Sequence, residues 1–182
     1  MKEWTVTRKL AFSALVVALY VAVMAVSAGF AFGQYQVRIA TALYALAGVF
    51  PFLTVPLGVA NFLSNALLGG LGPLDMIGGV TVGLLTAGTI ALCRRRSFAP
   101  AVAFAAITLI PGLGVPVWLS YLLNLPYSVL AASLLVGQAV CGVVGALLYE
   151  AKRRKLLALR AQGNPFSGRL NNVQINDVRR ID

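Results

Sequence analysis

Charged residues are almost absent from the long central stretch of this chain. Between Leu10 and Tyr149 the only charged side chains are Arg38, Asp75 and the arginine cluster 94–96. A soluble domain needs a charged surface, whereas a charge at the centre of a bilayer costs at least about 2.5–3.5 kcal/mol. The chain is therefore predicted to be a multi-pass protein of the cell membrane, and its two isolated charges are the first candidates for a functional site.

Turn-forming and charged residues divide the apolar stretch into six blocks. These blocks cover residues 10–32, 39–53, 56–71, 75–93, 98–122 and 126–149. About 20 residues are needed to cross the hydrocarbon core as a helix, and the second and third blocks are short for that length. The fifth block is interrupted by Pro111 and Pro116, so it is either a kinked helix or a short helix followed by an outer segment over 111–125.

Basic residues flank the apolar blocks and predict the orientation of the chain. They occur near the N-terminus, at 94–96 and at 152–155, and the positive-inside rule places all three groups in the cytoplasm. An even number of crossings must then separate them, which favours four helices before residue 94 and two after residue 96. We predict an all-α, six-helix transmembrane bundle over 1–155, with both termini cytoplasmic and a polar, mobile tail over 156–182.

Composition excludes several classes of function. The net charge of +10 follows the predicted topology, because the basic residues lie at the ends of apolar blocks, and no nucleic-acid partner is predicted. The chain has no histidine and only two cysteines, so neither a metal nor a cofactor is predicted. It carries no catalytic triad and no phosphate-binding loop. We therefore expect no enzyme, and any energy for uphill transport must come from a partner or an ion gradient.

Arg38 and Asp75 are predicted to lie at the same, outer end of the bundle. Asp75 follows Gly-Pro and opens the fourth block, so it is either a helix-capping residue or part of a polar mouth for a solute. Arg38 precedes the second block, where it either extends toward the membrane surface or borders the same mouth. Two opposite charges that stand alone on one side of a membrane protein make the solute-binding interpretation worth testing.

Other polar side chains are candidates for the same cavity. Asn61 and Asn65 are four residues apart and share one helix face, and amides in a bilayer must either bond between helices or line a cavity. Gln138 lies at mid-depth in the last block. The remaining candidates, Gln36, Trp118 and Tyr121, fall in the outer connectors, where aromatic residues also form a belt at the membrane interface.

Small residues recur every fourth position in three of the blocks. In the first block the stripe consists of Ala14, Ala18 and Ala22. The two others consist of Gly79, Gly83 and Ala87, and of Gly137, Cys141 and Gly145. Such stripes let another helix approach closely. Each is therefore either a contact inside the bundle or a docking surface for a separate membrane protein.

Four short segments in the first half of the chain occur in a specific order. They are Gln36-Val37-Arg38-Ile39-Ala40-Thr41-Ala42-Leu43, then Phe50-Pro51, then Asn61 to Asn65, then Leu71-Gly72-Pro73-Leu74-Asp75. With this pattern, residues 9–93 resemble the substrate-binding S-component of an energy-coupling factor (ECF) transporter, most closely the QueT family. The chain departs from the family pattern at Thr41, where a carboxylate is usual, and at Gln138, the polar residue nearest to an expected glutamate of the last helix.

The resemblance implies a subunit that captures a small solute from outside, namely a queuosine precursor of the aminomethyl-deazaguanine type. It also implies a transmembrane T-component and two ATPase subunits as partners, with Ala14, Ala18 and Ala22 docking on the T-component. Asp75 would accept from the amine-bearing edge of such a ligand, and Trp118 or a tyrosine would stack on its ring.

Two other functions remain open at this point. The chain could be an S-component for another vitamin or nucleobase, which would change only the pocket. It could also be a non-transporting membrane assembly protein whose polar residues serve helix packing alone. A membrane-embedded enzyme is disfavoured because acid–base groups are missing.

Overall fold

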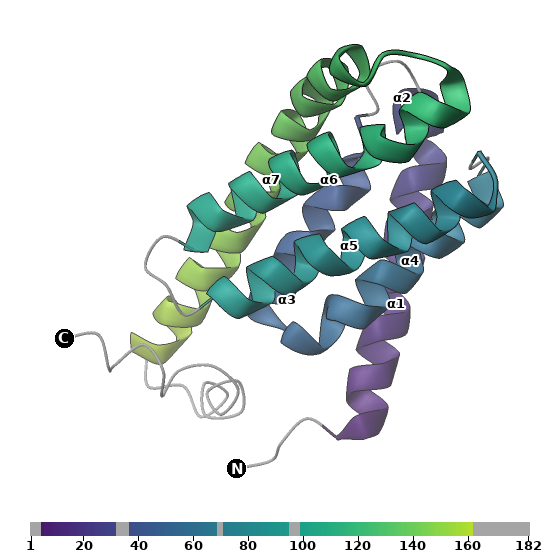
Figure 1. The fold of residues 1–182 in the computed structure, drawn as a ribbon. Coiled ribbons are helices and arrows are strands. Elements are labelled where there is room, and N and C mark those ends of the chain that lie inside the picture. Colours follow the sequence, from purple (N-terminus) through teal and green to yellow (C-terminus); the bar gives the residue numbers. More distant parts are fainter. Residues whose placement is uncertain (1–4, 32–36, 69–70, 95–98, 162–182) are drawn as a thin grey trace.

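Helices make up all the regular secondary structure in the part of the chain that the computed structural model describes, residues 5–31, 37–68, 71–94 and 99–161 (Figure 1). In chain order they are α1 (Val6–Val26), α2 (Ala28–Ala31), the 3-10 helix η1 (Ile39–Ala45), α3 (Leu46–Val49), the 3-10 helix η2 (Pro51–Leu53), α4 (Thr54–Leu68), α5 (Pro73–Cys93), α6 (Ala99–Leu123) and α7 (Tyr127–Ala161).

Five of the helical segments are long and apolar enough to cross a membrane. They cover residues 6–26, 51–68, 73–93, 99–123 and 127–155, which confirms an all-helical fold with several helices capable of spanning a membrane. The second expected block forms only the shorter apolar segment Ile39–Val49, about 20 Å long against a hydrocarbon core of about 30 Å. The count of six spans and the orientation of the termini therefore stay predictions.

The fifth block is one continuous helix. α6 includes both Pro111 and Pro116 and ends at Leu123, so the separate outer segment over 111–125 does not form. Prolines are tolerated in membrane helices where neighbouring helices satisfy the freed backbone groups. The turn to α7 passes through Asn124, whose φ of 51° is left-handed and suits asparagine better than a branched residue.

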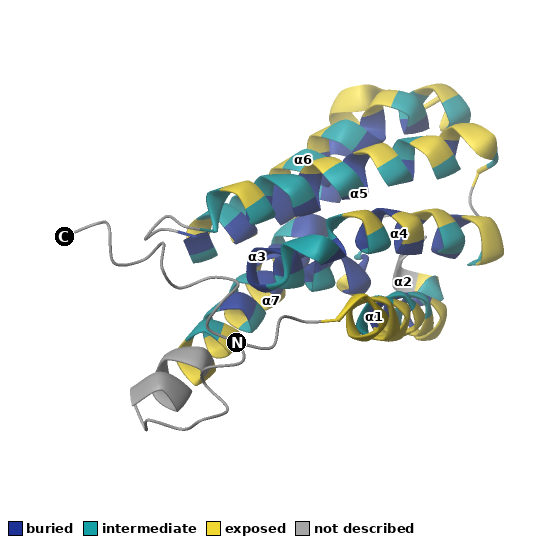
Figure 2. Cartoon of the chain, turned by 90° about the horizontal axis from the view of Figure 1, so that it is seen from below, coloured by how far each residue is buried: buried dark blue, intermediate teal, exposed yellow. Residues whose placement is uncertain are grey.

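The short segment η1 lies at the centre of the bundle. Its residues Ala40, Thr41, Ala42, Tyr44 and Ala45 are buried, and it packs on α7, α1, α5 and α6. Buried residues face inward on the surrounding helices as well, while exposed residues cover their outer faces (Figure 2). Alanines at η1 let the longer helices close around it, because they bury apolar surface with little bulk.

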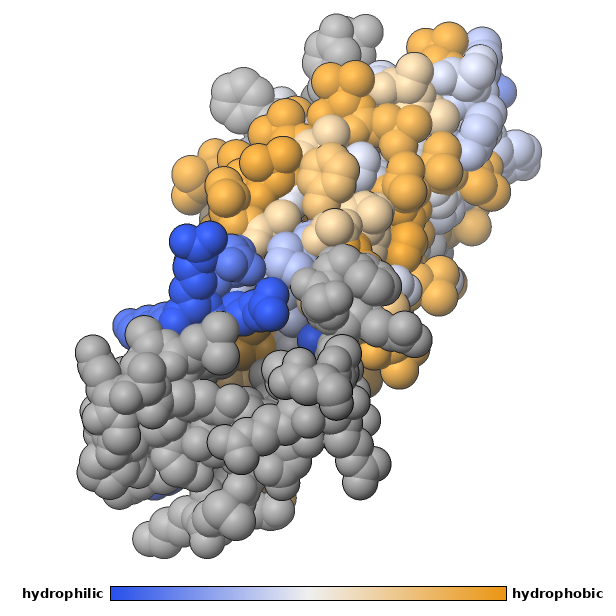
Figure 3. Space-filling view, turned by 90° about the vertical axis from the view of Figure 1, so that its left-hand side faces the viewer, coloured by the Kyte–Doolittle hydropathy of each residue, from blue (hydrophilic) through white to orange (hydrophobic). Residues whose placement is uncertain are grey.

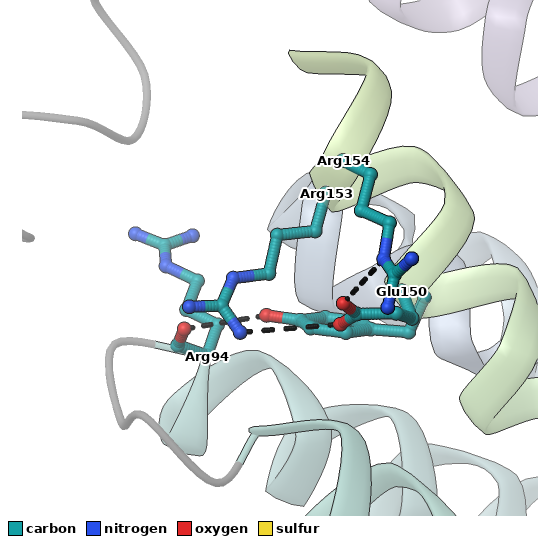
Figure 4. Close-up of polar contacts among 5 residues, drawn as sticks. Arg94, Glu150, Arg153 and Arg154 are labelled. Carbon is teal, nitrogen blue, oxygen red and sulfur yellow. Dashed lines mark hydrogen bonds and ion pairs between the residues drawn. The ribbon is translucent and has the colours of Figure 1, made fainter. Parts of the chain in front are cut away.

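Basic residues gather at one end of the bundle. There the Tyr149 hydroxyl donates to the main-chain oxygen of Arg94 at 3.3 Å, which joins the end of α5 to α7. Glu150 pairs with Arg154 at 2.9 Å and with Arg153 at 3.9 Å (Figure 4). Figure 3 shows hydrophilic residues at this end and hydrophobic side chains over the surface beyond it. The start of α1 and the end of α7 point to the same side (Figure 1).

Candidate functional site

A polar cavity lies in the opposite half of the bundle. It is lined by Arg38, Thr41, Tyr44, Asn61, Asp75, Gly79, Val82, Pro111, Val115, Trp118 and Gln138. Asp75 is in the first turn of α5, about 27 Å along the helix from the basic end. The cavity volume is about 10 Å³, close to the least that holds one water molecule, so a larger ligand must move its walls.

Arg38 and Asp75 are joined through Asn65. Nη1 of Arg38 donates to Oδ1 of Asn65 at 3.1 Å, and Nδ2 of Asn65 donates to the main-chain oxygen of Asp75 at 3.2 Å. The three residues are 5%, 0% and 3% exposed. Buried polar groups of this kind are tolerated only when they are hydrogen-bonded. The structure thus brings these three predicted site residues together, with Asn65 behind the cavity wall.

The Asp75 carboxylate has two partners. Its Oδ1 accepts from the Trp118 indole at 3.0 Å, and its Oδ2 accepts from the Leu71 main-chain N–H at 3.4 Å. The negative charge also lies near the N-terminus of α5, where the helix dipole favours it. Asp75 is not the N-cap residue of α5, which is Gly72, but its side chain both bonds to the main chain before the helix and lies beside the cavity.

Thr41 and Gln138 connect η1 to α7 at the cavity. The Thr41 hydroxyl lies 2.8 Å from the main-chain oxygen of Arg38 and 3.1 Å from Oε1 of Gln138. Gln138 is 2% exposed. These two neutral side chains are thus in hydrogen-bond contact.

Two buried tyrosines belong to the site although the sequence analysis did not select them. Nδ2 of Asn61 donates to the Tyr44 hydroxyl at 2.7 Å, and that hydroxyl lies 3.2 Å from the hydroxyl of Tyr20 on α1. Both tyrosines are fully buried. A tyrosine inside an apolar helix needs a polar partner, and this was the signal in the sequence that could have identified them.

The remaining predicted residues divide into three cases. Trp118 lines the cavity and packs on Gly78, where a Cβ atom would lie 2.6 Å from its ring. Tyr121 is 78% exposed and is not among the lining residues, so the structure does not bring it to the cavity. Gln36 lies outside the described residues.

A family model described as the QueT transporter matches residues 10–154. The chain belongs to the QueT transporter family. This membership confirms the resemblance seen in the sequence, and it identifies a transport protein and not an enzyme. No curated protein and no solved structure matches the chain significantly. The matched range includes every residue that lines the cavity.

The three stripes of small residues have different environments in this QueT family member. Gly79, Gly83 and Ala87 are buried, and so are Gly137, Cys141 and Gly145. Ala14, Ala18 and Ala22 are all exposed, while Val16, Tyr20 and Met24 form the buried face of the same helix. Only the stripe on α1 is therefore free, within the described chain, to contact another membrane protein.

Proposed function

We propose that this QueT family member is the substrate-binding S-component of an ECF-type importer. In this proposal it captures a queuosine precursor of the aminomethyl-deazaguanine type from outside the cell. The observation that carries the proposal is the cavity that combines one carboxylate, one guanidinium and two amides in the half away from the basic end. If that basic end is cytoplasmic, as the positive-inside rule predicts, the cavity lies in the outer half of the membrane.

The side chains around the cavity match the chemistry of such a ligand. A deazaguanine presents N–H donors on its amine-bearing edge, a carbonyl acceptor and a flat ring. The Asp75 carboxylate can accept from the amine edge or pair with the aminomethyl cation, but not fully with both. Arg38 supplies positive charge that suits the carbonyl acceptor of the ligand, and Trp118 offers an aromatic surface for its flat ring. The small cavity volume implies that binding separates the walls before they close on the ligand.

Energy for uptake must come from other subunits in this proposal. The chain has no phosphate-binding loop of its own, which supports a transmembrane T-component with two ATPase subunits as partners. The exposed Ala14, Ala18 and Ala22 supply a flat surface on α1 where a helix of the T-component can approach closely.

Another vitamin or nucleobase is the second candidate substrate. The neutral contact between Thr41 and Gln138 favours it, because the resemblance leads us to expect a carboxylate at position 41 and a glutamate early in the last helix, where Gln138 is the nearest polar residue. A ligand recognised through those carboxylates would bind this chain less tightly.

Mass spectrometry of small molecules released from the purified protein tests the substrate. We expect a mass that corresponds to a deazaguanine precursor, and binding of the same compound when it is added back. Release of a different vitamin or nucleobase would support the second candidate. A protein that releases nothing and binds none of these compounds would instead be an assembly protein.

A further inference from the structure

Arg38 determines the direction of the hydrogen bonds beside the cavity. A guanidinium only donates, so Asn65 must turn Oδ1 toward Arg38 and Nδ2 toward the main-chain oxygen of Asp75. This orientation brings the Asn65 NH₂ group against Gly79. A Cβ atom on Gly79 would lie 2.6 Å from Nδ2 of Asn65 and 2.9 Å from Oδ1 of Asn61.

The orientation of the Asn61 amide follows from that of Asn65. Oδ1 of Asn61 and Nδ2 of Asn65 both lie close to the position of a Cβ atom on Gly79, and Nδ2 of Asn61 donates to the Tyr44 hydroxyl. Turning the Asn61 amide over would bring two NH₂ groups together above Gly79. Electrostatics therefore favours the carbonyl of Asn61 at this position.

With the two amides oriented in this way, the Asn61 side-chain carbonyl has no hydrogen-bond donor. In the described part of the chain, Oδ1 of Asn61 is the one buried side-chain nitrogen or oxygen atom that has no hydrogen-bond partner. Asn61 is 4% exposed and lines the cavity. A buried, unpaired carbonyl is unfavourable, and native structures contain few of them. A donor supplied by a bound molecule would remove this cost.

We propose that Oδ1 of Asn61 is a ligand contact, which accepts an N–H from the bound solute. Together with Asp75 it selects a planar heterocycle that presents N–H donors on two sides, and this inference rests on the proposed function. Asp75 keeps capacity for a further donor, because a carboxylate has about four acceptor positions and Trp118 and Leu71 occupy two. A heterocycle with an acceptor facing Asn61 leaves two acceptors opposed and binds weakly.

The test compares Asn61→Leu and Asn61→Asp with the wild type. Leucine keeps the approximate volume but removes the acceptor, whereas aspartate retains one. Ser64→Ala is the matched control, because Ser64 is buried on the same helix, donates only to the main-chain oxygen of Asn61 among the described contacts and does not line the cavity. Titration calorimetry of purified protein with 7-aminomethyl-7-deazaguanine measures affinity, and thermal unfolding without ligand measures stability.

We expect Asn61→Leu to bind about ten- to a hundredfold more weakly, with Asn61→Asp and Ser64→Ala close to the wild type. Leucine also removes the hydrogen bond that Nδ2 of Asn61 donates to the Tyr44 hydroxyl, so thermal unfolding of the ligand-free variant serves to show that it is folded. Normal affinity in a folded Asn61→Leu protein would overturn the inference.

The proposed substrate can be wrong even where the inference about Asn61 is right. If the wild type does not bind 7-aminomethyl-7-deazaguanine, that substrate is wrong. The same titrations are then made with whichever compound is released from the purified protein, and normal affinity of Asn61→Leu for that compound would overturn the inference.

Discussion

At the scale of single residues, Asp75 shows how one side chain serves both the fold and the site. One carboxylate oxygen accepts from the main chain of Leu71 and closes the turn before α5, while the other accepts from Trp118 at the cavity. An asparagine can replace only one of these contacts with its single carbonyl oxygen, because both partners are donors. It also lacks the charge that a cationic or N–H-rich solute would seek.

Asp75→Asn is therefore expected to fold but to bind weakly. Loss of a charge-assisted hydrogen bond corresponds to about ten- to a hundredfold in affinity, measured by titration with the compound that the wild type binds. Stability should fall by about 1–3 kcal/mol, because either the Leu71 N–H or the Trp118 indole loses its acceptor. Near-normal affinity in the folded variant would mean that Asp75 is a capping residue and not a ligand contact.

At the scale of secondary-structure elements, the helix faces decide what each stripe of small residues does. On α5 the small residues admit the polar groups of α4 and η1, since a Cβ atom on Gly83 would lie 2.9 Å from the Tyr44 hydroxyl. On α1 Ala18 and Tyr20 lie about 200° apart around the helix axis. One face of α1 therefore reaches the tyrosine pair beside the cavity, while the alanine stripe faces outward.

The interior stripe is tested by Gly79→Ala. An added Cβ would press on the amides of Asn65 and Asn61 and disturb the contact between Asn65 and Arg38. We expect a loss of stability of about 1–3 kcal/mol together with weaker binding. Gly88→Ala is the matched control, because the nearest atom to its Cβ would be 3.9 Å away, on Thr54. Equal stability and affinity of the two variants would show that the amides move aside freely.

The exposed stripe is tested by Ala18→Trp. If α1 docks on a T-component, the bulky ring should abolish uptake into cells while ligand binding by the purified subunit stays normal. Val140→Trp, at a position of α7 that is 53% exposed, controls for the effect of an added tryptophan in the lipid-facing surface. Loss of ligand binding with normal complex assembly would instead assign the stripe to packing within the bundle.

At the scale of the whole molecule, charge separates the two ends of the bundle. Apart from Arg38, the described basic residues lie at the ends of α5 and α7 and the start of α1, while Arg38 and Asp75 line the cavity in the other half. The cell's potential and lipid composition favour basic residues on the cytoplasmic side. This arrangement predicts that the cavity opens away from the cytoplasm.

Cysteine labelling tests this topology. In a background with Cys93→Ala and Cys141→Ala, a cysteine introduced at position 36 should react with a membrane-impermeant reagent from outside. A cysteine at position 97 should react only after the membrane is opened, because it lies beside the arginine cluster 94–96. Labelling of position 97 in intact cells would contradict both the helix count and the predicted orientation.

The sequence by itself determined the membrane class, the helical blocks and their breaks. The absence of charges marks the apolar blocks and proline and glycine mark the breaks, and both signals depend only on neighbouring residues along the chain. It also selected Arg38, Asn65 and Asp75 from the rarity of polar groups between Leu10 and Tyr149. The order of the four short segments in the first half of the chain indicated the QueT family before any contact was known, and the family model confirms it.

Only the tertiary structure decided which faces of the helices meet. It showed that the second block forms only the shorter helical segment Ile39–Val49, that Tyr121 is exposed, and that Tyr20 and Tyr44 form a chain of contacts to Asn61. These facts depend on how each helix is rotated against neighbours distant in sequence, and hydropathy is nearly uniform around such apolar helices. The unpaired Asn61 carbonyl is the clearest case, because its orientation follows from Arg38 through a chain of contacts between η1, α4 and α5.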